Sequence, residues 1–179
     1  IYPRKSIPAN AILRYKYGMA VEEQSAGQRN KEPYNRFISM NFMICRDAFL
    51  KVRFDETFHL GYEDTLFGMQ LEQAGVEILH IDNPVYHLVE ENSEQFLMKI
   101  RRAVRNLDGH IEQMHSHVKL LRWYACVKRL GMAPLVAFLF RQIEKRLVSN
   151  LPSRKPSLKL FAFYKLGYLC NFLSQKKPD

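Results

Sequence analysis

Cysteine is scarce in this sequence. Its three cysteines, Cys45, Cys126 and Cys170, lie far apart among 179 residues. No two of them form a Cys-x-x-Cys pair, which excludes the usual cysteine pattern of a structural metal site. An odd number spread so widely also argues against a disulfide framework. The cysteine content therefore predicts a reduced, cytoplasmic protein.

Long hydrophobic runs are also missing. The longest apolar stretch near the carboxyl end, Met132 to Phe140, is shorter than the roughly 20 residues that a membrane-spanning helix needs. The first residues, Ile1 to Lys5, contain no apolar core of a signal peptide, and the chain does not begin with Met. We therefore expect a chain without a membrane span that is part of a larger protein.

Acidic residues are few in the second half of the chain. Residues 1–94 hold 10 Lys and Arg against 14 Asp and Glu, whereas residues 95–179 hold 17 against 4. The net charge of +9 is thus divided into −4 and +13. This division predicts acid chemistry in the first part and an anionic partner for the second.

Residues 1–92 are expected to form an α/β unit. Stretches with apolar residues three and four positions apart alternate with short apolar runs that are typical of strands. Gly75 marks a helix end, and Asp82-Asn83-Pro84 marks a turn. The predicted helices are 9–28, 46–52 and 63–74, and the predicted strands are 37–44 and 76–81.

Residues 93–179 are expected to form an all-α, basic extension. Strand patterns disappear after Ser93, which is a typical N-cap residue for a long helix. The residues Pro152 to Pro156 interrupt the later helical pattern. The predicted helices are 93–116, 118–130, 133–149 and 157–175.

Two neighbouring carboxylates, Glu63 and Asp64, lie in the first turn of a predicted helix. Acidic residues are favoured there by the helix dipole without any functional role. A carboxylate fixed at the start of a rigid helix and facing a cleft also suits a general base, because the dipole keeps it ionised. The residue types alone leave both interpretations open.

His87 follows the predicted strand 76–81 and a proline turn. A single histidine is more often a packed or surface residue than a ligand. Ligand sites in α/β proteins, however, lie beyond the carboxyl ends of strands, and His87 has that position. It is therefore a candidate ligand or site residue.

Several short motifs follow one another between Phe37 and His87. In chain order they are Asn41-Phe42, Arg46, Phe49, Phe54-Asp55-Glu56, Gly61-Tyr62-Glu63-Asp64 and His80 to His87. This ordered run resembles the second half of the catalytic domain of family-2 glycosyltransferases, which have the GT-A fold. The stretches Leu13 to Gly18 and Phe96 to Lys99 are similar to one bacterial branch of that family.

The resemblance implies roles for individual residues. Asp64 matches the catalytic base of inverting members, and Glu63 orients the acceptor or supports Asp64. His87 matches a histidine that completes a divalent-metal site for Mn²⁺ or Mg²⁺. Ser39, Asn41 and Tyr62 are expected to bind the donor or the acceptor.

The resemblance also implies that the domain is incomplete. It predicts that residues 1–92 are a partial, Rossmann-like GT-A half-domain and that residues 93–179 are a helical extension. The nucleotide-binding half of such enzymes carries an Asp-x-Asp metal motif, and residues 1–36 contain no such motif. Most metal ligands and the nucleotide pocket are therefore expected outside this sequence.

The function implied is a hexosyltransferase-like enzyme of polysaccharide or lipopolysaccharide biosynthesis. It would transfer a sugar from a nucleotide-sugar donor to a glycan or lipid-linked acceptor, with inversion. The alternative is a non-catalytic basic helical module that binds an anionic membrane or nucleic acid.

Charged faces of helices are commonly just solvated, but the basic extension also suits an anionic surface. Lipid on the inner face of the membrane is the expected partner, because no nucleic-acid-binding signature accompanies the charge; docking on another subunit is a further possibility. The basic residues that suggest it are Arg141, Lys145, Arg146, Arg154, Lys155, Lys159 and Lys165, among aromatic residues such as Phe138, Phe140, Phe161 and Tyr164.

We predict that residues 1–179 alone do not transfer sugar, because the implied nucleotide-binding half lies outside them. The measurement is nucleoside diphosphate release from a panel of sugar nucleotides in the presence of Mn²⁺. Detectable transfer by these residues alone would contradict the prediction.

Overall fold

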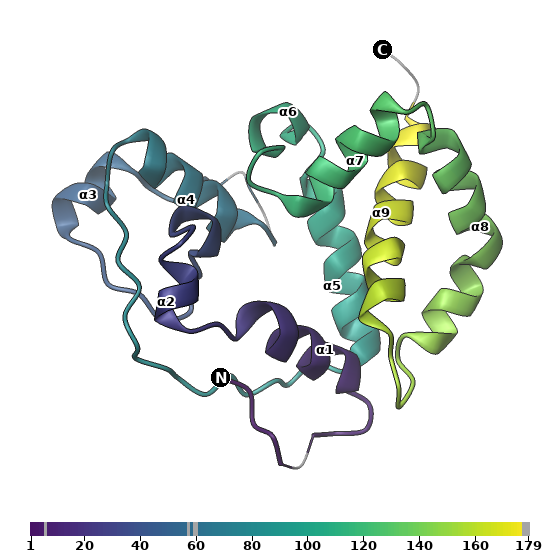
Figure 1. Cartoon of the computed structure of the whole chain (residues 1–179), viewed down its shortest axis with the longest axis horizontal. Coiled ribbons are helices and arrows are strands. Elements are labelled where there is room, and N and C mark those ends of the chain that lie inside the picture. The colour runs from purple at the N-terminus through teal and green to yellow at the C-terminus, as the bar shows by residue number, and fades with distance from the viewer. Residues whose placement is uncertain (6, 57, 59–60, 177–179) are drawn as a thin grey trace.

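The computed structural model describes residues 1–5, 7–56, 58 and 61–176, and every regular element among them is helical (Figure 1). The first part holds shorter elements and the second part longer ones. In chain order they are α1 (Ile12–Tyr17), the π-helical turn η1 (Gly18–Glu22), α2 (Ala26–Arg29), the 3-10 turn η2 (Tyr34–Arg36), α3 (Arg46–Lys51), α4 (Glu63–Gln73), α5 (Ser93–Asn106), α6 (Ile111–Met114), α7 (Lys119–Arg129), α8 (Ala133–Asn150) and α9 (Leu158–Gln175).

The predicted strands are not formed, and the α/β, Rossmann-like class predicted for residues 1–92 is wrong. Side chains in 76–81 do alternate between α4 and water, and Leu79 and Ile81 are 78% and 60% exposed. A strand also needs a neighbouring backbone. Within the described part of the chain, no backbone hydrogen bond joins 37–44 or 76–81 to a second extended segment.

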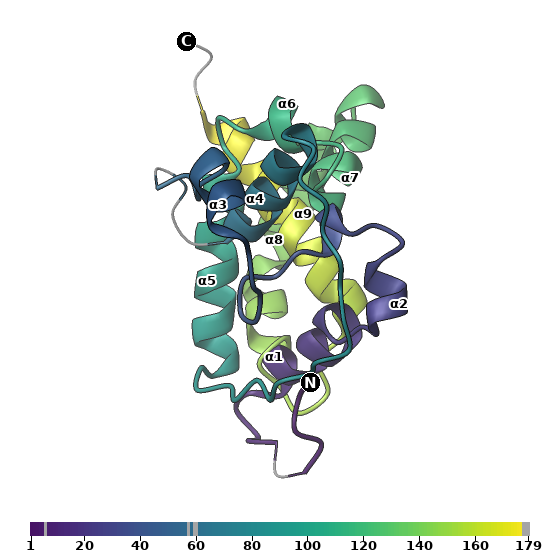
Figure 2. The same cartoon turned by 90° about the vertical axis from the view of Figure 1, so that its left-hand side faces the viewer.

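At His80, the side chain of Asn30 makes the hydrogen bonds that the backbone of a neighbouring strand would make. The backbone N–H of His80 donates to Oδ1 of Asn30 over 2.8 Å, and Nδ2 of Asn30 donates to the carbonyl of His80 over 2.8 Å. The extended run after α4 passes down the outside of the molecule towards the amino terminus (Figures 1 and 2). There, Ile1 donates to the carbonyl of Val85 and accepts from the N–H of His87.

The predicted helices are largely confirmed. Helices α3, α4, α7, α8 and α9 begin and end within a few residues of their predicted bounds. The predicted helix 93–116 ends earlier, at Asn106, and Gly109 has a φ of +84°. The predicted helix 9–28 is divided among α1, η1 and α2.

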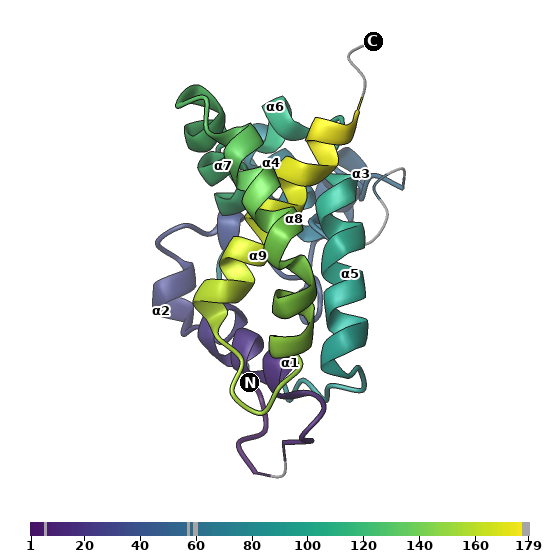
Figure 3. The ribbon, with the colours of Figure 1, turned by 90° about the vertical axis from the view of Figure 1, so that its right-hand side faces the viewer.

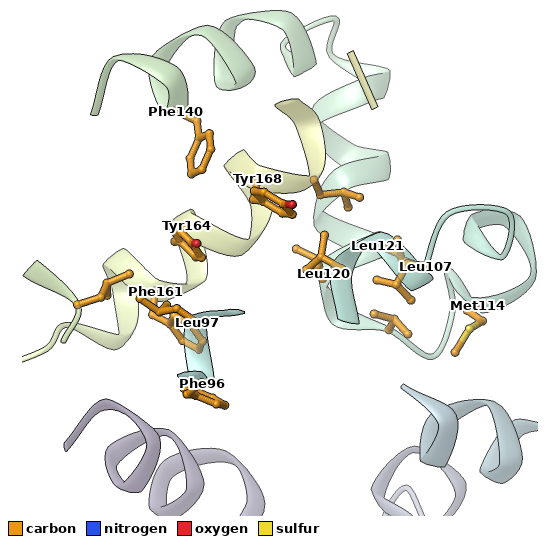
Figure 4. Packing of buried hydrophobic residues seen from close by; sticks show 14 of the residues in the cluster. Phe96, Leu97, Leu107, Met114, Leu120, Leu121, Phe140, Phe161, Tyr164 and Tyr168 are labelled. Carbon is orange, nitrogen blue, oxygen red and sulfur yellow. The ribbon is translucent and has the colours of Figure 1, made fainter. Parts of the chain in front are cut away.

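The main hydrophobic core lies where α9 packs between α5 and α8 (Figures 1 and 4). Phe140 of α8 and Tyr164 of α9 are fully buried, with ring centroids 5.7 Å apart. Leu13 of α1 and Leu66 and Met69 of α4 belong to the same buried cluster. One core therefore includes residues from both sides of the predicted boundary at residue 92.

Two arginines of α5 satisfy buried tyrosine hydroxyl groups on α9. Nε of Arg101 donates to the hydroxyl of Tyr164, and Nε of Arg105 donates to the hydroxyl of Tyr168 over 2.6 Å. Arg101 also forms an ion pair of 2.9 Å with Glu144 of α8. Part of the positive charge of the extension thus holds its helices together.

We predict that Gly167→Ala destabilises the protein. A Cβ atom at Gly167 would lie 2.6–2.8 Å from carbon atoms of Phe140, so α8 and α9 would have to separate. Overpacking of this kind costs about 1–3 kcal/mol of unfolding free energy. Urea denaturation followed by circular dichroism measures the change. Gly27→Ala is the control, since nothing lies within 4 Å of its added Cβ; equal loss in both variants would contradict the prediction.

Candidate functional site

Two residues with positive φ precede α4. Gly61 has a φ of +90°, and a Cβ atom there would lie 2.3 Å from the Cβ of Ala103, so only glycine allows the chain to approach α5 this closely. Tyr62 has a φ of 71°, in the left-handed region. This conformation is strained for tyrosine by about 1–3 kcal/mol, and such strain concentrates at functional sites. The start of α4 is therefore held in an unusual, fixed geometry.

Burial accounts for the position of the Tyr62 side chain. It packs against the main core, and its removal from water, with Tyr17 nearby, raises the pKa of its hydroxyl well above the usual range. The hydroxyl of Tyr62 is therefore protonated at neutral pH. The partly buried ring thus holds Tyr62 against the core, while Gly61 lies against α5.

Glu63 and Asp64 form the first turn of α4, as predicted. Oε2 of Glu63 and Oδ1 of Asp64 are shielded from solvent and have no hydrogen-bond partner among the residues that the structure describes. No side chain caps the helix start. The free N–H groups of the first turn carry partial positive charge. A carboxylate oxygen in this position can accept a proton or a hydrogen bond from a bound hydroxyl group.

A hollow of about 900 Å³ is lined by the extended segments 37–44 and 76–87 and by Leu71 of α4. Asn41 lines it and donates through Nδ2 to the carbonyl of Asn83 over 3.1 Å. Ser39 is half-buried in the same segment and does not line the hollow. The other polar groups that line it include Glu22, Glu23, Arg29, His80 and His87.

His87 is stacked on Tyr2 at the edge of this hollow, with ring centroids 5.1 Å apart. Its Nδ1 is buried and has no hydrogen-bond partner in the described part of the chain. Burial, followed by the positive charge of Arg14, lowers the pKa of the imidazole below its usual value. His87 is therefore neutral at physiological pH and has one free ring nitrogen.

A buried arginine network beside His87 is the feature that the sequence-based prediction missed. Arg14 donates to both carboxylate oxygens of Glu22 over 3.1 Å and to Oε1 of Glu91 over 3.1 Å. Tyr2 donates to Glu22, and Lys99 forms an ion pair with Glu91. Arg14 lies in the stretch Leu13 to Gly18, which is the part of the sequence that drew attention to this network beforehand.

The residues near His87 do not fit a complete metal site. Among the described residues, no group of three or more His, Cys, Asp or Glu side chains is arranged to hold a metal ion. The imidazole of His87 can supply one ligand, whereas Mn²⁺ and Mg²⁺ need several oxygen ligands. No chemical step through a metal is therefore derived from these residues.

The predicted site residues lie in two places. Tyr62, Glu63 and Asp64 lie together at the start of α4. Asn41 and His87 lie together in the hollow, which the three α4 residues do not line. The structure thus does not bring Asp64 and His87 into one cleft.

Comparison with known proteins gives no match: no protein-family model, no curated protein and no solved structure matches the chain. Its function is therefore inferred from its residues and their geometry.

We predict that Arg14→Gln destabilises the protein by about 2–4 kcal/mol, because it removes the cation of the partly buried Glu22 and leaves Glu91 with Lys99 alone. It should also raise the pKa of His87, since the charge of Arg14 lowers it. Urea denaturation and the pH dependence of the His87 imidazole NMR signals measure the two effects.

The exposed arginine Arg4, paired with Glu23, provides the control. Arg4→Gln should change stability by less than about 1 kcal/mol.

In the unmodified protein, the lowered pKa of His87 means that the folded state binds fewer protons than the unfolded state. Stability should therefore fall as the pH drops below the usual histidine value of 6.5. An unchanged His87 pKa in Arg14→Gln would refute this account.

Proposed function

We propose that this chain is the acceptor-side part of a glycosyltransferase that uses Asp64 as its general base. The donor would be a nucleotide sugar and the acceptor a glycan or a lipid-linked sugar. The observation that carries the proposal is the carboxylate of Asp64, which has an unpartnered, shielded Oδ1 at a helix start fixed by Gly61 and Tyr62. The ordered motifs from Asn41 to His87 support the same class of enzyme.

The reaction suits a single carboxylate. An acceptor hydroxyl oxygen attacks the anomeric carbon as the bond from that carbon to the phosphate oxygen breaks. Asp64 takes the hydroxyl proton, and the nucleoside diphosphate leaves with the bonding electron pair. Displacement in one step inverts the configuration, as in inverting glycosidases. Glu63, in the same helical turn, would hold a second hydroxyl group of the acceptor.

If the chain were a non-catalytic binding module, the surroundings expected for the carboxylate of Asp64 would be different. In a scaffold, a carboxylate at a helix start is expected to cap the helix, form an ion pair or face bulk water. Oδ1 of Asp64 faces no bulk water, and no ion pair or capping bond of Asp64 is found among the described residues. The lack of a cap or an ion pair therefore favours the enzyme. The enzyme also requires Asp64 to open to a cleft near His87, and Asp64 does not line the hollow that His87 lines. The basic helices can still bind a partner of their own.

We predict that Asp64→Asn removes most sugar transfer in a longer form of the protein that includes the implied nucleotide-binding half. General-base catalysis contributes about 10²–10⁴-fold to rate, so kcat should fall by that factor with little change in donor KM. Nucleoside diphosphate release is measured over a panel of sugar nucleotides with Mn²⁺ or Mg²⁺ and with a chelator control.

Asp47→Asn is the matched control, because Asp47 also lies in the first turn of a helix but is exposed. It should retain full activity, and both variants should keep their circular dichroism spectra. Equal release by Asp64→Asn and the unmodified protein would exclude Asp64 from the mechanism. No release from any donor, even with lipid-linked acceptors, would favour the basic binding module.

A further inference from the structure

The turn between α7 and α8 exposes a group of large apolar side chains. Figure 3 shows α8 on the outer side of the molecule, with the α7–α8 turn at one end of it. The side chains of Leu130 and Trp123 are 62% and 56% exposed. A group of large apolar side chains exposed to water commonly marks a binding surface. We call this group the elbow surface; its members are Trp123, Leu130, Met132, Leu135, Phe138 and Leu139.

Helical spacing places the apolar residues of each helix on one outer face. Leu135 and Leu139 of α8 are four positions apart, and Met132, the N-cap residue of α8, is three before Leu135. Trp123 of α7 and Leu130, the C-cap residue of α7, are seven positions apart. The opposite face of α8 carries Ala137, Phe140 and Leu147, which are buried against the core. The outer face is therefore not needed for packing within the chain.

Positive charge surrounds the elbow surface. Between residues 119 and 150 the sequence has a single acidic residue, Glu144, and its carboxylate is paired with Arg101 at 2.9 Å. The basic side chains of this stretch are all exposed; they are Lys119, Arg122, Lys128, Arg129, Arg141, Lys145 and Arg146. A partner for this surface must therefore be apolar at its centre and anionic around it.

The lengths of the two helices limit how they can enter a membrane. Among the described residues, no single helix is long and apolar enough to cross a bilayer. Helices α7 and α8 reach that length and composition only as a pair, and they are bent by 115° relative to each other. Such a pair, amphipathic and flanked by cations, fits the membrane interface.

We propose that the α7–α8 hairpin, residues 119–150, lies in the interface of an anionic membrane. The elbow surface enters the boundary between headgroups and acyl chains, while the surrounding Lys and Arg side chains contact the lipid phosphates. This inference goes beyond the proposed sugar transfer and does not depend on it.

Two other occupants fit the surface less well. Nucleic acid would pair with the cations but leave the elbow side chains in water. A second copy of the chain would cover the apolar side chains but place two sets of seven cations against each other. Charge complementarity therefore favours anionic lipid.

The structure also changes which residues face the lipid. Phe140, Phe161 and Tyr164, which the sequence suggested for this role, are buried in the core. Lys165 lies over the ring of Tyr17 at 5.0 Å, and burial lowers the pKa of its amine to about 8. These residues are thus excluded from the binding surface.

The single tryptophan of the chain, Trp123, lies in the elbow surface and provides the measurement. The protein is mixed with vesicles of phosphatidylcholine alone or in an equimolar mixture with phosphatidylglycerol. We expect the Trp123 emission to shift to shorter wavelength and to be protected from acrylamide with the anionic vesicles, and high salt should weaken the effect. Absence of any shift with anionic vesicles would overturn the proposal.

Matched variants test the surface itself. Combined Leu130→Ser, Leu135→Ser and Phe138→Ser should weaken vesicle binding by about tenfold or more. The control combines Met43→Ser, Leu79→Ser and Leu88→Ser, which alter even more exposed apolar residues outside the hairpin and should leave binding unchanged. Equal loss in both would overturn the proposal.

Charge variants and competing partners complete the test. Lys128→Gln and Arg129→Gln should each weaken binding to anionic vesicles by about fivefold. A Trp123 shift with single-stranded RNA but not with vesicles would replace lipid by nucleic acid. Self-association in light scattering, with Trp123 already protected before vesicles are added, would replace it by a second copy of the chain. Neither result bears on sugar transfer, which is measured separately.

Discussion

The packing of α9 between α5 and α8 is the constraint on which the rest of the structure depends. Its tyrosine hydroxyl groups enter the core and must find donors or acceptors there, since an unsatisfied buried hydroxyl would be costly. Arg101 and Arg105 of α5 meet this need. Because the inner face of α8 is committed to the core, the large apolar side chains that residues 93–176 leave exposed belong mainly to the α7–α8 hairpin. The same packing thus stabilises the helices and leaves one surface free.

The α4 helix links this core to the candidate site. Leu66 and Met69 are buried in the main cluster, whereas Phe67 and Leu71 are buried under the extended segments. The helix is therefore held from both sides, and its first turn cannot move without disturbing one of the two clusters. A carboxylate on such a helix start is positioned by packing rather than by its own hydrogen bonds. This is the property expected of a proton acceptor that must be ready before its substrate arrives.

Sequence reasoning located most helices because their pattern is local. Apolar residues at helical spacing, with Gly75 after α4 and Pro134 in the first turn of α8, specify these two helices without reference to the rest of the chain. The run 76–81 has the alternation of a strand, but a strand is completed by another backbone, and alternation cannot supply one. The position of Asp64 at a helix start was predictable for the same local reason. The network of Arg14 was not, because its partner Glu91 is 77 positions away.

The contacts of the amino-terminal segment have a consequence for how the chain folds. Helices α8 and α9 are neighbours in sequence, so their packing closes a short loop. By contrast, Arg14 bonds to a residue 77 positions away, and Lys16 donates to the carbonyl of Pro156, 140 positions away. Closing such long loops costs more chain entropy, and the cost grows with the logarithm of their length. The first two dozen residues therefore make several hydrogen bonds to residues that are far away in sequence. They are expected to join the helices late in folding and to open first, with the earliest exchange of their amide hydrogens.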